Sequence, residues 1–111
     1  MASLATVNYT VLQERTKDKE AISNLKMIRA AQIAHDMDTG DYYPSTGSES
    51  NITNINFNLK LLLPSASTRN WNYAVWSTGC SRATRNGGDG RSLFLRINDP
   101  DGEPDLGAGC P

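Results

Sequence analysis

The sequence has few of the residues from which catalytic and metal sites are usually built. Its 111 residues include one histidine and two cysteines, so no histidine cluster or second cysteine pair can complete a zinc site. No G-x-S-x-G, P-loop or H-E-x-x-H pattern occurs either. We therefore expect that the protein is not an enzyme, and that His35, near the end of a predicted helix, has a structural role.

Long apolar runs and a strong net charge are also absent. No uninterrupted apolar stretch approaches the ~20 residues that a helix needs to cross a bilayer, and no signal peptide is visible after Met1. The formal net charge is −1, so no broad field attracts nucleic acid, which we do not expect as a partner. Several arginines recur in the later part of the chain, and we interpret them as solvated strand residues: Arg82, Arg85, Arg91 and Arg96.

What the sequence does contain is a long helical pattern. From Leu4 to Met37 there is no proline or glycine, and this predicts a helix over residues 4–39 that ends at Gly40 in a left-handed cap. Ile22, Leu25 and Ile28 form a bulky stripe suited to a core. A flatter side is lined by Met27, Ala30, Ala31, Ala34 and Met37.

Charges of both signs alternate in the first half of this helix. Glu14 with Lys17 and Arg15 with Asp18 are three positions apart and can pair on a solvated helix surface. Such exposed pairs contribute only a few tenths of a kcal/mol each. The segment is therefore compatible with a helix but is not predicted to be core.

After the helix the pattern changes from a loop to strands. Residues 40–70 are polar and turn-rich, with a short helix expected to lead into "LKLLLPS" and to end at Pro64. Residues 71–97 alternate with a period of two, as strands do, with turns at Gly79 and "NGGDG". We expect a single α+β domain over residues 1–111: a long N-terminal helix packed on an antiparallel meander of about three strands, then a C-terminal loop over residues 98–111.

The two cysteines, Cys80 and Cys110, lie 30 positions apart. They are either two unrelated reduced thiols or a disulfide. We favour the disulfide because Cys110, the penultimate residue, would otherwise lie on a frayed tail. A disulfide would indicate an oxidising compartment.

The order of these elements resembles the type IV pilin and type II secretion pseudopilin superfamily. The stretch "KDKEAISNLKMIRAAQIAHDMDTGDYYPS" is similar to the part of the pilin helix that follows the membrane segment, together with its "T-G-x-Y-Y-P" turn. The segments "LKLLLPS" and "NWNYAV" are similar to the short helix and first strand of pseudopilins. Cys80 and Cys110 resemble the pair that closes the C-terminal loop of many pilins. The resemblance covers roughly residues 4–111.

The resemblance implies a structural subunit of a type IV pilus or a type II secretion-like filament. Family members begin with a basic leader and an apolar membrane helix, so we expect this chain to be a soluble, N-terminally truncated form; a natural soluble protein with a pilin-like domain is the alternative. The implied partners are copies of the chain, other pilins and the inner-membrane assembly machinery. The implied location is the inner membrane and periplasm before assembly, and the cell surface afterwards.

Two sets of residues suit assembly in such a filament. Small side chains permit close helix approach, at Ala30, Ala31 and Ala34, and mixed charges can set the register between subunits, at Glu14, Arg15, Lys17 and Asp18. The alternative is that the alanines face the domain's own sheet and the charges are solvated. Another function remains open: a minor pilin at a filament tip that binds a surface, DNA or exported cargo through residues 45–58.

The tail "DPDGEPD" is a candidate calcium loop. It places carboxylates at every second position around Gly102, and calcium takes six to eight oxygen ligands. Some major pseudopilins bind calcium in a C-terminal loop, although this loop departs from theirs. The candidate ligands are Asp99, Asp101, Glu103 and Asp105; the alternative is an acidic, solvated turn.

Overall fold

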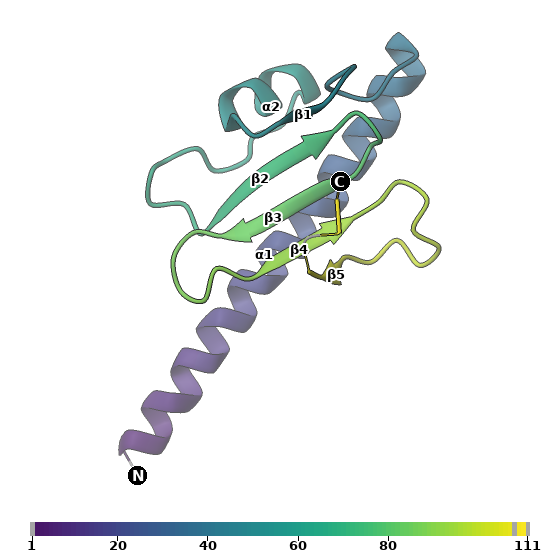
Figure 1. Cartoon of the computed structure of the whole chain (residues 1–111). Coiled ribbons are helices and arrows are strands. Elements are labelled where there is room, and N and C mark those ends of the chain that lie inside the picture. Colours follow the sequence, from purple (N-terminus) through teal and green to yellow (C-terminus); the bar gives the residue numbers. More distant parts are fainter. Residues whose placement is uncertain (1, 108, 111) are drawn as a thin grey trace.

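A computed structural model of the chain describes residues 2–107 and 109–110, with side chains from Gln13 onward. Two helices and five strands follow one another in these residues (Figure 1). Their bounds are α1 Ala2–Thr39, β1 Ser48–Glu49, α2 Ile52–Leu59, β2 Trp71–Trp76, β3 Ser81–Arg85, β4 Ser92–Leu95 and β5 Asp105–Leu106. The predicted α+β class, with an N-terminal helix packed on an antiparallel sheet, is confirmed.

The helix α1 sets the length of the molecule. It has 38 residues, which at 1.5 Å per residue correspond to about 57 Å, and the longest dimension of the molecule is 57 Å. The helix ends where predicted: Gly40 has φ +90°, and its N–H donates to the Asp36 carbonyl at 2.7 Å. In Figure 1 the C-terminal part of α1 lies behind the sheet, while its N-terminal turns continue beyond the sheet's edge.

The sheet contains five strands in the described residues, in the order β1-β2-β3-β4-β5, each antiparallel to the next. The three central strands are the predicted meander. The prediction of about three strands was wrong because it missed β1 and β5, which have two residues each. A strand of two residues is too short to show an alternation of apolar and polar side chains in the sequence. These two strands are defined by their pairing with neighbouring strands, such as Ser48 with Trp76 and Leu93 with Leu106.

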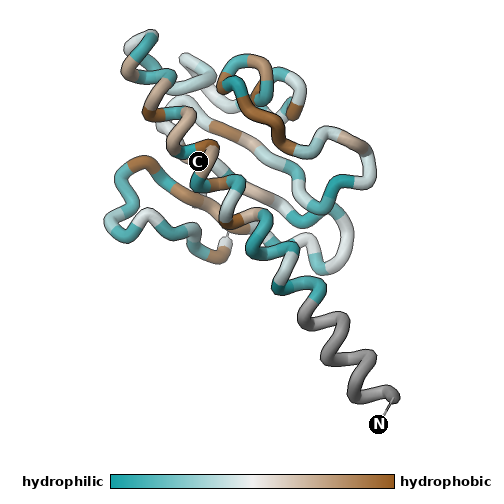
Figure 2. Tube along the Cα trace, turned by 180° about the vertical axis from the view of Figure 1, so that it is seen from behind, coloured by the Kyte–Doolittle hydropathy of each residue, from teal (hydrophilic) through white to brown (hydrophobic). Residues whose placement is uncertain are grey.

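The core lies between α1, α2 and the face of the sheet that meets them. Leu25 and Ile28 of α1 are fully buried, as the bulky stripe predicted, and they join Trp71 and Val75 of β2. Figure 2, seen from the α1 side, shows the helix crossing the sheet, with hydrophobic stretches on the strands and around α2. Burying each such side chain stabilises the fold by about 1.5–3 kcal/mol.

Polar groups at this seam are also satisfied. The Trp71 indole N–H donates to the Lys17 carbonyl at 2.8 Å, and the Asn24 amide donates to the Tyr73 hydroxyl at 2.8 Å. The fully buried amide of Gln32 donates to the Tyr43 carbonyl at 2.6 Å and accepts from the Tyr43 N–H at 2.8 Å. The bonds of Trp71 and Tyr73 fix the position of α1 along β2. Those of Gln32 hold the loop that follows α1 against the helix, because an unpaired buried amide would be costly.

The short helix α2 lies earlier in the chain than predicted. It begins after Asn51, whose side chain accepts from the N–H groups of Thr53 and Asn54, and it ends at Leu59. Lys60, with φ 57°, terminates it in a left-handed conformation. The prediction that Pro64 ends the helix was therefore wrong, because α2 ends at Leu59 and "LLLPS" has no regular secondary structure.

The turn between β2 and β3 requires glycine at position 79. Gly79 has φ +86°, and a Cβ there would lie 2.3 Å from Cγ1 of Ile97 and 3.2 Å from Cδ2 of Tyr42. We predict that Gly79→Ala lowers the free energy of unfolding by roughly 2–4 kcal/mol, from backbone strain and overpacking together. Chemical denaturation followed by circular dichroism measures this.

Gly90→Ala is the matched control for this substitution. Gly90 also has a positive φ, +66°, but a Cβ there meets nothing within 4 Å. Gly90→Ala should therefore lower the free energy of unfolding only through backbone strain, by about 1 kcal/mol. Equal losses in the two variants would show that the contact with Ile97 does not matter.

Candidate functional site

A cluster of ionic side chains joins the first half of α1 to the hairpin between β3 and β4. We define the Glu14 cluster as Glu14, Asp18, Arg85, Asp89 and Arg91. Oε1 of Glu14 lies 3.3 Å from Nε of Arg85 and 3.0 Å from Nη1 of Arg91. Arg91 also pairs with Asp18, and with Asp89 at 2.9 Å.

The cluster shifts the protonation equilibria of its carboxylates. The pKa of Glu14 is lowered to about 2, because Arg85 first, then Arg91 and Lys17, hydrogen-bond its charged form. Lys17 Nζ lies 3.1 Å from Glu14 Oε2, as the three-residue spacing predicted. The pKa of Asp89 is also lowered, chiefly by its hydrogen bond to the Arg91 side chain.

This cluster corrects the expectation of solvated strand arginines for two of the four, Arg85 and Arg91; Arg96 is exposed as expected. The Arg85 side chain is only 9% exposed and that of Arg91 only 18%, since both reach from the β3–β4 hairpin to α1. Glu14 and Asp18, predicted to set register between subunits, bind within their own domain. A sequence signal did exist: two carboxylates one helical turn apart can face arginines that flank a tight hairpin.

The other predicted assembly residues divide into two groups. Ala30, Ala34 and Arg15 are exposed, whereas Ala31 is half-buried and packs against the core. Ala31 and Ala34 line a hollow of about 440 Å³ between the end of α1 and the end of α2, together with His35, Asp38, Asn58, Leu59 and Lys60. The exposed alanines thus leave one side of α1 open to close approach by another chain.

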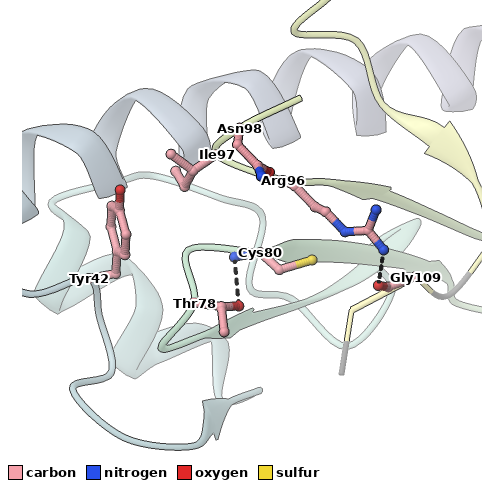
Figure 3. A pocket seen from close by; sticks show the side chains of 7 residues that line it. All are labelled: Tyr42, Thr78, Cys80, Arg96, Ile97, Asn98 and Gly109. Atoms are coloured by element: carbon pink, nitrogen blue, oxygen red, sulfur yellow. Dashed lines mark hydrogen bonds between the residues drawn. The ribbon is translucent and has the colours of Figure 1, made fainter. Parts of the chain in front are cut away.

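The predicted disulfide between Cys80 and Cys110 is confirmed. It ties the tail to the start of β3, and beside it lies a cavity of about 530 Å³. In Figure 3, Tyr42 stands at one end of this cavity, and Arg96, which donates to the Gly109 carbonyl at 2.8 Å, stands at the other. The cavity is lined by Tyr42, Thr78, Cys80, Arg96, Ile97, Asn98 and Gly109, and none of these described residues is a carboxylate or histidine that could act as a catalytic base.

The structure does not gather the four candidate calcium ligands into one group. Asp99 Oδ1 accepts from the Asp101 N–H at 3.4 Å, and Asp101 Oδ1 accepts from the Glu103 N–H at 2.9 Å. Glu103 turns away to Lys26, at 2.6 Å, and Asp105 lies in β5. Among the described residues no three His, Cys, Asp or Glu side chains are arranged to hold a metal ion.

The two aspartates that do lie close together influence each other. The pKa of Asp99 is raised, chiefly by a hydrogen bond with the Asp101 side chain. The pKa of Asp101 is lowered, chiefly by the Glu103 backbone N–H that it accepts. This arrangement is that of consecutive turns closed by aspartate side chains.

We compared the chain with known families, curated proteins and solved structures. None matches it. Among the described residues, no helix combines the length and apolar character needed to cross a membrane. The disulfide is typical of proteins that fold in an oxidising compartment. The function must therefore be inferred from the geometry described above.

The lowered pKa of Glu14 leads to a prediction for acid stability. Its folded-state pKa of about 2 lies below the ordinary value of 4.5, so its contribution is complete above about pH 4.5 and is lost as the pH falls toward 2. We predict that Glu14→Gln lowers Tm at pH 7 and flattens the decline of Tm between pH 4.5 and 2. Thermal unfolding at a series of pH values measures both effects.

Asp38→Asn is the control for the acid series. Asp38 is an exposed carboxylate on the same helix, and it forms no ion pair among the described residues. Its Tm should therefore run parallel to that of the parent chain across this pH range. If Glu14→Gln also runs parallel to the parent down to pH 2, the Glu14 cluster does not stabilise the fold.

The disulfide leads to a prediction for global stability. It closes a loop with a sequence separation of 30 residues, and restricting the unfolded chain in this way stabilises the fold by about 3–4 kcal/mol. We predict that replacing both cysteines by serine lowers the free energy of unfolding by that amount in urea titrations. The parent chain under reducing conditions should unfold at the same midpoint as the double variant. An unchanged midpoint in both would contradict the prediction.

Proposed function

We propose that the chain is the pilin-like head and stalk of a filament subunit, of the type IV pilus or type II secretion kind. The observation that carries this proposal is that α1 is longer than the part of it that packs on the sheet. Among the side chains that the structure describes, from Gln13 onward, contacts with the sheet begin at Glu14 and extend through Ile28, while the helix begins at Ala2. Its N-terminal turns run beyond the sheet as a rod (Figure 1), and such a rod contributes little to the stability of the head itself.

The exposed side of α1 supports association with copies of the chain. Ala30 and Ala34 are small and exposed, and Met27 and Met37 on the same side are 45% and 83% exposed. A helix surface of alanine and flexible methionine permits close, adaptable packing against another helix. In this proposal the alanine side of α1 meets neighbouring subunits, while Leu25 and Ile28 hold the helix to its own sheet.

The Glu14 cluster has a different role in the proposal from the one predicted. Because Glu14 and Asp18 bind the arginines of the same domain, they fix the head at one rotation about α1. Glu14 and Asp18 are then not available to set the register between subunits, and in this proposal contacts between the surfaces of neighbouring heads set it instead. An apolar continuation of α1 would anchor the subunit in the inner membrane before assembly and would lie at the centre of the filament afterwards.

Cysteine cross-linking tests the proposal. Both native cysteines are joined in the disulfide, so a single introduced cysteine supplies the only free thiol. We predict that Ala34→Cys, in the protein expressed from its own gene in the cells that make it, yields dimers with a short bismaleimide. Electron microscopy of sheared cell-surface material should show filaments that contain the protein.

Asn72→Cys is the matched control, because Asn72 is exposed on the face of the sheet that points away from α1. It should give markedly fewer dimers than Ala34→Cys. Equal or absent cross-linking at the two positions, together with an absence of filaments, would overturn the proposal. A gene with no apolar stretch ahead of Leu4 would also contradict it.

A further inference from the structure

The face of the sheet opposite α1 carries a polar pocket. Trp71 and Tyr73 point toward α1, where they bind Lys17 and Asn24, so the alternate residues Asn72 and Ala74 point away. In Figure 1 this outer face is turned toward the reader, with α1 behind it. It contains a shallow pocket of about 370 Å³, which we call the outer pocket, lined by Ser50, Arg69, Asn72, Tyr73, Ala74, Arg82 and Thr84.

Both arginines of the outer pocket have unused hydrogen-bond donors. The Arg82 guanidinium carbon lies 4.9 Å from the centre of the Trp76 ring, but its side chain donates to no oxygen of the described residues. Arg69 donates through Nη1 to the Ala66 carbonyl at 3.0 Å, while its Nη2 donates to no oxygen of the described residues. A guanidinium with free donors can bind an oxyanion that enters the pocket.

The arginines of the outer pocket differ from Arg85 and Arg91 in that they have no carboxylate partner in the part of the chain that the structure describes. Arg85 and Arg91 are neutralised by Glu14, Asp18 and Asp89, whereas none of the described residues that line the outer pocket is a carboxylate. Two cationic groups without an internal counter-charge favour an oxyanion, which a guanidinium can bind with two parallel hydrogen bonds. The remaining lining residues are uncharged, and three of them, Ser50, Asn72 and Thr84, have side chains that can hydrogen-bond.

The neutral groups narrow the class of ligand. The Asn72 amide and the hydroxyls of Ser50 and Thr84 line the pocket, and amides and hydroxyls both donate and accept, as sugar hydroxyls do. Single-stranded nucleic acid fits less well, since it uses open aromatic faces and a longer basic track. Here Arg82 already covers Trp76, and the chain has a net charge of −1.

We propose that the outer pocket binds a carboxylated sugar unit of an acidic polysaccharide. Arg82 and Arg69 bind the carboxylate, while Asn72, Thr84 and Ser50 contact the hydroxyls of the same sugar. This inference does not depend on the filament proposal, because it concerns the outer face of the head alone.

Titration of the 111-residue chain with a galacturonate trimer, followed by two-dimensional NMR, tests the inference. We expect saturable shifts at Asn72, Ala74, Arg82 and Thr84, and none with the neutral galactose trimer. Arg82→Gln should raise the Kd for the galacturonate trimer at least about tenfold. Arg82→Lys keeps the charge but cannot form two parallel hydrogen bonds, so its Kd should lie between those of the parent chain and Arg82→Gln. Circular dichroism establishes that each variant is folded.

Arg96→Gln is the matched control. Arg96 also lies over an aromatic ring, with its guanidinium carbon 5.0 Å from the centre of the Phe94 ring, and it forms no ion pair among the described residues. It lies outside the outer pocket, so its removal should leave Kd within about twofold. Equal losses of affinity in Arg82→Gln and Arg96→Gln would show that binding depends only on the overall charge of the chain, and would overturn the inference.

Two further probes distinguish other sources of negative charge. Inorganic phosphate and a ten-nucleotide oligothymidine should bind more weakly than the galacturonate trimer. Tighter binding of the oligothymidine would assign the face to nucleic acid and overturn the sugar assignment. An absence of saturable binding by the galacturonate trimer would overturn it as well.

Discussion

The packing of α1 against β2 is the interaction on which the rest of the structure depends. Trp71 and Val75 are buried against Leu25 and Ile28, and the Trp71 indole also bonds to the backbone of α1. This seam combines apolar area, which supplies most of the stabilisation, with hydrogen bonds that permit only one alignment. Once α1 and β2 are aligned, β3 and β4 follow by antiparallel pairing, and α2 closes the remaining side of the core.

Two further interactions, the Glu14 cluster and the disulfide, hold the parts of the sheet that do not pack against this seam. At the β3–β4 hairpin, the Glu14 cluster binds a polar turn that has little apolar area of its own. At the opposite end of the sheet, the disulfide holds a tail whose residues are mostly polar or glycine. Glycine at position 109 fits this role, since a Cβ there would lie 2.5 Å from the Phe94 ring. Charge and covalent bonding thus act where hydrophobic burial is weakest.

Much of this architecture could be predicted from local patterns. The glycine-free run that ends at Gly40, the alternation of β2 and the hairpin signal at Asn86 are all short-range features, and the structure confirms the elements that they predict. The disulfide was also favoured correctly. What could not be predicted depends on residues far apart in sequence: the two-residue strands and the pairing of Glu14 with Arg85. The unpaired donors of Arg69 and Arg82 emerge only when β2 and β3 lie side by side.

The continuity of α1 has a mechanical consequence. The helix passes from its N-terminal turns into the core without a proline or glycine between Leu4 and Met37, so no hinge separates the two parts. A pull along the helix axis therefore loads the contacts of Glu14, Trp71, Leu25 and Gln32 together, in shear, rather than peeling them one after another. Rupture would require these bonds to fail at once, which makes the head resistant to tension applied through its own stalk.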